Sequence, residues 1–165
     1  MNPQNLKLVI DTNVWLDDFF GDRPFHKDAR ALIDLAISKQ VQLFHAITTE
    51  KDVYYLSCAT LKAKERASSG CVSDESAHAI ASISNALIGK LESLSTPIAL
   101  DATDTWTARH LQSIHADFED CLIMAAAVRA NADFVVTNDR KLLQHCAVAA
   151  LSCADMAAYL RRPER

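Results

Sequence analysis

The chain has 165 residues, half of them apolar, and a formal net charge of −4. This length is typical of one folded domain, residues 1–165, which can bury a sizeable core without disulfides or structural metal ions. The five cysteines include no CxxC pair and the six histidines include no HExxH or HxxxH pair, which argues against a disulfide framework and a zinc site. The sequence has no bilayer-spanning apolar run and no signal-peptide pattern, so we expect a cytoplasmic protein without a membrane partner.

The first half of the chain predicts two short strands, each followed by helices. The run LKLVI is apolar and rich in β-branched residues, which is typical of a buried strand, and this one ends at Asp11. Gly21 stops the helical pattern that follows, and Pro24 can open the next helix. The predicted elements are strands at residues 6–10 and at 41 to 44 or 46, and helices at 12–20, 24–37 and about 50–63.

The second half continues the alternation of helices and strands. Residues 68–74, SSGCVSD, form the clearest loop of the chain. The predicted elements after it are helices at residues 75–94, 102–114, 117–130, 140–145 and 155–161, and strands at 97–100, 133–136 and, more weakly, 147–150. Alternation of this kind favours an α/β fold in which helices cover both faces of a parallel sheet.

Four separated carboxylates are expected at one edge of this sheet. Asp11 ends the first strand, Asp139 follows the fourth, and Asp120 and either Asp52 or Glu50 lie near helix starts. Functional groups of parallel sheets gather at the carboxyl ends of the strands. Packed carboxylates repel one another, so they take up protons or are held together by cations. Oxygen ligands alone suit Mg²⁺ or Mn²⁺ better than zinc.

The same acids have structural interpretations. Asp11 and Asp139 can each cap the helix that follows, and Asp117 can cap the next helix with Asp120 reaching back. Asp120, however, directly precedes the apolar run CLIMAAAV, where an unpaired carboxylate is costly to bury.

The second acid is a choice between Asp52 and Glu50, which point in roughly opposite directions on the helix. Asp52 shares a face with Leu56 and flanks Val53, so we place it at an inner stripe that also includes Thr60, and we expect Glu50 to face outward. This favours Asp52.

Three segments together resemble the PIN-domain family. They are VIDTNVWLDDFF, ITTEKDVYYL and DFEDCLIMAAAVRANADFVVTND, which occur in this order and extend the likeness over essentially the whole chain. The sequence is most similar to small bacterial single-domain members, the group that includes VapC-type toxins. The resemblance implies a three-layer α/β/α sandwich with a central, mostly parallel sheet of four or five strands.

The resemblance also implies a metal-dependent endoribonuclease that hydrolyses phosphodiester bonds with Mg²⁺ or Mn²⁺. Asp11, Asp120 and Asp139 match the metal ligands, and Asp52 stands where toxin members usually carry Glu. The supporting positions are Asn13, Glu50, Asp117 and Thr137. The implied partners are an RNA substrate, an antitoxin protein that would cover the site, and a second copy of the chain in a homodimer.

Other residues could serve these partners. Trp15, Phe19 and Phe20 could line an interface groove, although aromatic residues more often pack in the core. Candidate RNA contacts are basic residues, although runs of charge are more often solvated faces. These residues are Lys62, Lys64, Arg66, Arg129, Arg140, Lys141, Arg161, Arg162 and Arg165.

Two other functions remain open. A phosphatase could use Asp11 as its nucleophile, but such enzymes commonly need a second Asp two positions on, where this chain has Asn13. A PIN-like binding module with weak or no activity is the stronger alternative, because Asp52 is one methylene shorter than the usual Glu.

Overall fold

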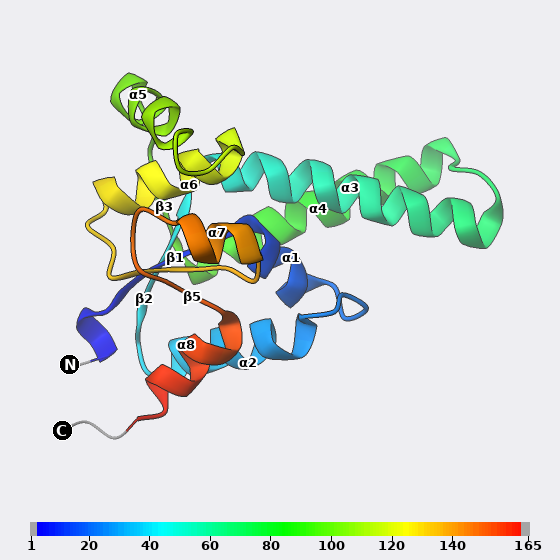
Figure 1. The fold of residues 1–165 in the computed structure, drawn as a ribbon. Helices are drawn as coiled ribbons and strands as arrows, with labels where there is room; N and C mark the ends of the chain where they lie inside the picture. The colour runs from blue at the N-terminus through cyan, green and yellow to red at the C-terminus, as the bar shows by residue number, and fades with distance from the viewer. Residues whose placement is uncertain (1–2, 163–165) are drawn as a thin grey trace.

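The computed structural model describes residues 3–162, and its centre is a five-stranded sheet (Figure 1). All five strands are parallel and lie in the order β3-β2-β1-β4-β5. The strands are β1 Lys7–Ile10, β2 Gln42–Ala46, β3 Thr96–Ile98, β4 Phe134–Val136 and β5 Ala150–Leu151. Short apolar runs form such strands because helices bury both faces of a parallel sheet. The predicted α/β architecture is confirmed.

Helices cover both faces of the sheet (Figure 1). A short 3-10 turn, η1 (Pro3–Asn5), precedes the sheet. Helices α1, α2 and α8 pack on one face, while α6 packs on the other and α5 lies against α6. The helices are α1 Thr12–Phe19, α2 His26–Ser38, α3 Thr48–Ser69, α4 Asp74–Leu94, α5 Ala102–Leu111, α6 Phe118–Arg129, α7 Arg140–His145 and α8 Cys153–Leu160. None of these helices is long and apolar enough to cross a bilayer.

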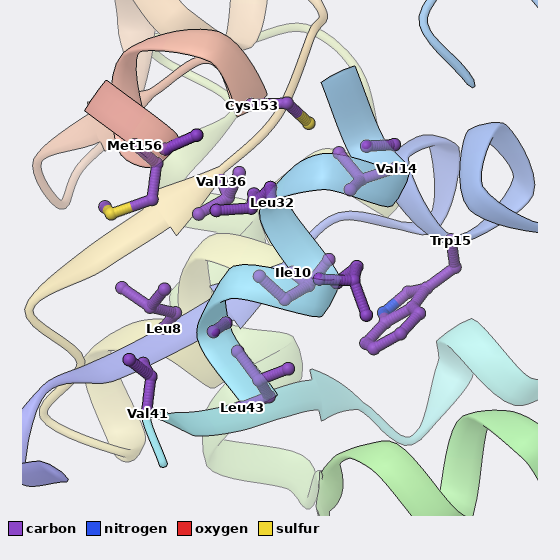
Figure 2. Packing of buried hydrophobic residues seen from close by; sticks show 14 of the residues in the cluster. Leu8, Ile10, Val14, Trp15, Leu32, Val41, Leu43, Val136, Cys153 and Met156 are labelled. Atoms are coloured by element: carbon purple, nitrogen blue, oxygen red, sulfur yellow. The ribbon is translucent and has the colours of Figure 1, made fainter. Parts of the chain in front are cut away.

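The larger core lies between the sheet and helices α1, α2 and α8 (Figure 2). Trp15 is fully buried there and Phe20 is nearly so, while Phe19 is partly buried against the same cluster. These aromatic residues therefore stabilise the core, and Trp15 and Phe20 are not available to line an interface groove.

Helices α3 and α4 form a long hairpin that projects beyond the sheet (Figure 1). Helix α3 continues past its predicted end at residue 63 and stops at Gly70, whose φ of 80° is readily adopted by glycine. The predicted inner stripe was right at Val53, which is fully buried, and wrong at Leu56, which is 45% exposed. The buried residues are Thr49, Val53 and Ser57, which are small enough to let α1 approach closely.

Several other boundaries differ from the predictions, and two of these differences are at β5 and α2. The last strand is Ala150–Leu151 rather than residues 147–150, because only these two residues pair with β4. Pro24 lies before α2, and Phe25 occupies the N-cap position without a side-chain hydrogen bond to the helix. Neither difference alters the positions of the candidate acids.

Candidate functional site

Strand β1 lies between β2 and β4, so the chain winds in opposite directions on its two sides. Ligands of such sheets bind at this switch point, beyond the carboxyl ends of the strands. Ile10 and Val136 are paired in register, which brings the next residues, Asp11 and Thr137, side by side. The Asp11 amide donates a hydrogen bond of 3.0 Å to the carbonyl oxygen of Val136.

A buried hydroxyl connects two of the candidate acids. Thr137 Oγ1 donates a hydrogen bond of 2.7 Å to Asp11 Oδ2, and it accepts one of 3.0 Å from the backbone amide of Asp139. Thr137 is fully buried. Thr137 thus joins the two strand ends, and its supporting role stays a prediction.

Asp11 is a buried carboxylate with raised proton affinity. Its side chain is at the base of the site and the residue is only 1% exposed. Burial raises the pKa of Asp11 to about 6, and the charges of Asp120 and Asp139 add to the shift, while the Thr137 hydrogen bond opposes it. Three of the predicted acids are therefore close enough to affect one another electrostatically.

Asp120 has a partner that the sequence analysis did not identify. His115 Nε2 lies 2.6 Å from Asp120 Oδ2, and His115 is almost completely buried. Burial raises the pKa of Asp120, the His115 hydrogen bond opposes this shift, and the charges of Asp117 and Asp139 add to it. No residue pattern pointed to His115, because a turn after α5 brings it back onto the first turn of α6.

Asp117, Asp120 and Asp139 open onto a pocket of about 640 Å³ between α6 and α7, and the buried Asp11 is not among its lining residues. Its lining residues are Ile114, His115, Ala116, Asp117, Asp120, Asp139, Lys141 and His145. Acids and cationic or titratable groups thus face the same space. Such a mixed lining suits a ligand that carries negative charge and reaches the acids through a cation.

Asp11, Asp117 and Asp139 also cap the helices that follow them, as predicted. Asp139 Oδ1 caps α7 through the backbone amides of Lys141 and Leu142, at 2.7 and 3.0 Å. Asp117 caps α6, but Asp120 does not complete the expected reciprocal box, since its carboxylate contacts His115 instead.

Asp11 likewise caps α1, through a 3.5 Å contact with the backbone amide of Asn13. The Asn13 residue itself is exposed. Asn13 therefore supports Asp11 through its main chain, and capping holds all three carboxylates in place without neutralising their charge.

The two candidates for the second acid have different partners. Glu50 Oε1 lies 3.2 Å from Nε2 of the buried His45, so Glu50 does not extend freely outward as predicted. Asp52 Oδ1 lies 3.0 Å from Lys51 Nζ, which also lies 3.5 Å from Glu119 on α6. Asp52 therefore faces the start of the helix that carries Asp120, while Glu50 is tied to β2.

Several cations proposed as RNA contacts already have partners. Arg129 binds Asp104 at 2.7 and 2.8 Å and Asp101 at 2.6 Å, which ties α6 to α5. Lys64 binds Asp22 at 2.8 Å. Between residues 3 and 162, the side chains of Arg140 and Lys141 form no ion pair, while Arg165 lies outside the described residues.

The donor set fits a divalent cation in its chemistry. Among the described residues, no three Asp, Glu, His or Cys side chains lie close enough together to form a ready-made metal site. Nevertheless, Asp11, Asp120 and Asp139 repel one another, and Asp11 is buried without a cationic partner in the described chain. A hard cation with oxygen ligands would relieve this repulsion.

Solved structures of other proteins share the fold of this chain, and a family model matches its sequence. The chain is similar to VapBC2 from Rickettsia felis, crystallised with a DNA fragment from its promoter (TM-score 0.62, 14% identity, 89% of this chain and 98% of that chain). It is also similar to PAE2754 from Pyrobaculum aerophilum (TM-score 0.56, 13% identity, 94% of this chain and 95% of that chain). A search of curated protein sequences finds no match. Residues 7–141 match the PIN domain, and the chain therefore belongs to the PIN domain family.

Proposed function

We propose that this protein is a metal-dependent endoribonuclease that hydrolyses RNA at the pocket between α6 and α7. PIN domains are generally nucleases that use divalent metal ions. The observation that carries the proposal is the electrostatic repulsion among the carboxylates of Asp11, Asp120 and Asp139 at the switch point of the sheet. A divalent cation would neutralise part of this negative charge, and it could then bind a phosphate group of the RNA.

Each residue near the site has a part in this proposal. Asp11, Asp120 and Asp139 would hold Mg²⁺ or Mn²⁺, and the ion would supply charge neutralisation at the phosphate and an activated water. Thr137 orients Asp11, and His115 fixes the side chain of Asp120. Lys141, at the pocket wall, is placed to attract the phosphodiester backbone.

The first test is cleavage of a single-stranded RNA in Mn²⁺ by the wild type and by Asp120→Asn. We expect the variant to lose at least about 100-fold in kcat/KM, since even outer partners of metal ligands cost about 10- to 100-fold. Glu119→Gln is the matched control, because Glu119 is an exposed neighbour on the same helical turn. Equal cleavage by Asp120→Asn, or cleavage that persists in EDTA, contradicts the proposal.

Metal binding has a readout that does not depend on activity. Mn²⁺ at about 100 times its Kd should add about 2.7 kcal/mol to the free energy of unfolding. For a chain of this size, that corresponds to a rise in Tm of about 5–10 °C. The same titration separates the two second-acid candidates, because we expect Asp52→Asn to weaken the shift and Glu50→Gln to leave it nearly unchanged. The reverse result would assign the role to Glu50.

A PIN-like binding module with weak or no activity is the second candidate. The absence of a closed metal cluster among residues 3–162, together with Asp52 in place of the usual Glu, favours it. In this case Mn²⁺ would leave Tm unchanged and RNA would bind without being cut.

A role as the toxin of a toxin–antitoxin pair belongs to the same proposal. It is supported by the sequence resemblance to VapC-type toxins and by a fold shared with VapBC2. If the protein is such a toxin, we expect it to bind an antitoxin, to form a homodimer and to act in the cytoplasm. Co-expression with the product of the adjacent reading frame, followed by size-exclusion chromatography and a cleavage assay, tests for a partner that binds and inhibits.

A further inference from the structure

Helix α5 displays an unusually exposed aromatic residue. Trp106 is 60% exposed, whereas Trp15, the other tryptophan of the chain, is fully buried. Exposing an indole ring to water gives up the burial energy that makes tryptophan useful in a core. Trp106 also takes no part in the clusters that hold α5 against α6. Packing of α5 against the rest of the protein therefore does not explain why a tryptophan occupies position 106.

The Trp106 ring is held in place by its neighbours. The rings of Trp106 and His110 lie 3.8 Å apart between centroids, with an interplanar angle of 39°. His110 Nδ1 lies 2.8 Å from the carbonyl oxygen of Trp106, and this contact fixes the imidazole one turn along the helix. An ordered ring loses less conformational freedom when a ligand stacks on it.

A free cation stands beside the two rings. Trp106, Arg109 and His110 line an open surface pocket of about 300 Å³. No ion pair involves Arg109 within the part of the chain that the structure describes. Arg129, by contrast, is bound to Asp101 and Asp104. Arg109 thus offers an unshared guanidinium to an anionic ligand.

The outer face of α5 continues toward the acidic pocket. Trp106, His110 and Ile114 follow one another at intervals of four residues, and Ile114 lines that pocket together with Asp117 and Asp120. Helix α5 ends at Leu111, and the turn that follows is held by hydrogen bonds from the Ile114 and His115 amides to the Leu111 carbonyl oxygen. The stretch from Trp106 to Ile114 is therefore on the order of 12 Å long, which a few nucleotides of single strand can span. The two pockets can therefore be reached by one extended ligand.

We propose that Trp106, supported by His110 and Arg109, is a stacking platform for an unpaired base of the nucleic acid whose phosphodiester enters the acidic pocket. The inference rests on the proposed function, because that function provides a reason for single-stranded RNA to lie along α5. Aromatic rings stack on bases of any sequence, and arginine contacts the backbone phosphate. A duplex would hide its bases from the ring, so the platform selects single-stranded segments.

The surroundings of Trp106 favour a nucleic acid over a protein partner. Apart from this ring and Ile114, the exposed residues of α5 and its final turn are small, polar or cationic: Ala102, Thr103, Thr105, Arg109, His110, Gln112 and Ser113. A protein interface normally surrounds its aromatic anchor with further apolar contacts that exclude water. A ring beside a free cation instead matches the base and phosphate of one strand.

The test measures binding without cleavage. A 12-nucleotide oligoadenylate is titrated into the full chain carrying Asp120→Asn, with EDTA present, and tryptophan fluorescence is recorded. We expect quenching, because Trp106 is the exposed tryptophan and Trp15 is shielded. Because Trp106→Leu removes the reporter ring, the Kd of the parent and of each variant is measured by the anisotropy of a fluorescein-labelled oligoadenylate, and adding Trp106→Leu should raise this Kd by about 5- to 150-fold, the range for loss of one stacked base. Trp106→Phe keeps an aromatic face and should stay within about threefold of the parent, and Tyr55→Leu is the control for an exposed aromatic residue elsewhere.

The outcomes separate this inference from the proposed function. A duplex of the oligoadenylate with oligouridylate is titrated in parallel, and we expect it to bind more weakly than the single strand. Unchanged affinity in Trp106→Leu, equal loss in Trp106→Phe, absence of quenching, or equal binding of this duplex each overturns the platform. If the wild type cuts RNA in Mn²⁺ but Trp106→Leu has the same KM, the nuclease stands and the platform fails. If oligoadenylate quenches Trp106 but the wild type cuts no RNA, the platform stands and the nuclease fails. Arg109→Gln should reduce the salt dependence of binding by about one phosphate contact.

Discussion

Helix α1 carries a buried carboxylate at each end, and the two carboxylates have different neighbours. Asp18, in the last turn, is fully buried with Arg30 Nε at 3.0 Å and Lys90 Nζ at 3.8 Å. Neither carboxylate oxygen of Asp18 has a hydrogen-bond partner within the described residues, but Arg30 Nη2 donates a hydrogen bond of 3.0 Å to the main-chain carbonyl oxygen of Asp18. Asp11, the N-cap, contacts the Thr137 hydroxyl and lies close to the negative charges of other acids.

The difference distinguishes a structural carboxylate from a candidate ligand. Burial raises the pKa of Asp18, but Arg30 and Lys90 oppose the shift, and their positions join α1 to α2 and α4. At Asp11 the charges of nearby acids raise the pKa further. The described residues thus supply cations at one end of the helix and none at the other, where Asp11 is a candidate metal ligand.

The largest expected effect comes from removing a cation at the Asp18 end. Arg30→Gln leaves Asp18 buried with only the more distant Lys90. Breaking a fully buried ion pair costs about 3–5 kcal/mol, but Arg30 is 39% exposed and Lys90 remains, so we expect about 2–3 kcal/mol at pH 7.5. Urea unfolding measures the loss, with Lys27→Gln on an exposed position of α2 as control. If the two variants are equally stable, Asp18 and Arg30 do not form a structural pair.

An effect of similar size but opposite sign is expected at Asp11. Its pKa rises from 3.8 to about 6 on folding, so the folded state binds the proton more tightly than the unfolded state. Stability without metal should therefore fall as pH rises from about 4 to 7, by about 2–3 kcal/mol from this group. Asp11→Asn should remove this loss and be more stable than the wild type at pH 8 in EDTA.

Urea unfolding of both proteins at pH 5 and pH 8, with EDTA present, checks this prediction. At pH 5 the advantage of Asp11→Asn should be about half of its value at pH 8, since above pH 3.8 the unfolded chain already ionises Asp11 while the folded carboxyl, with a pKa of about 6, is still mostly protonated. If Asp11→Asn is less stable than the wild type at pH 8, then Asp11 stabilises the fold as Asp18 does, and the comparison fails.

The smallest effect is expected where a similar ion pair lies at the surface. Lys64 and Asp22 lie 2.8 Å apart, but their side chains are 46% and 62% exposed. Lys64→Gln should change the free energy of unfolding by less than about 1 kcal/mol, because solvent screens exposed pairs. A loss as large as that of Arg30→Gln would show that burial is not what makes the Asp18 contact strong.

Much of the fold follows from the sequence because its strands are short, apolar and parallel. Residues 6–10 and 133–136 have this character, and both runs contain the strands that the structure has. The strand near residues 147–150 was misplaced because a two-residue edge strand gives almost no periodic signal. The length of α3 was also underestimated, since its last turns face solvent and carry no apolar stripe.

The site was predictable where it depends on strand ends. Asp11 and Asp139 could be located because each follows a strand of the sheet, and their electrostatic contact with Asp120 agrees with the expected convergence. His115 could not be located, because its contact depends on how a turn packs onto α6. The contact of Glu50 with His45 depends equally on tertiary packing and has no sequence pattern.

The pairing of β1 with β4 has a consequence for how this gene can tolerate insertions and deletions. Asp11 and Thr137 meet because Ile10 is in register with Val136. A codon gained or lost in the exposed tip of the α3–α4 hairpin leaves that register intact. One gained between Val136 and Asp139 separates the hydroxyl from the second carboxylate while the sheet still forms. Length variation among functional homologues should therefore concentrate at the hairpin tip and be absent from the three residues after β4.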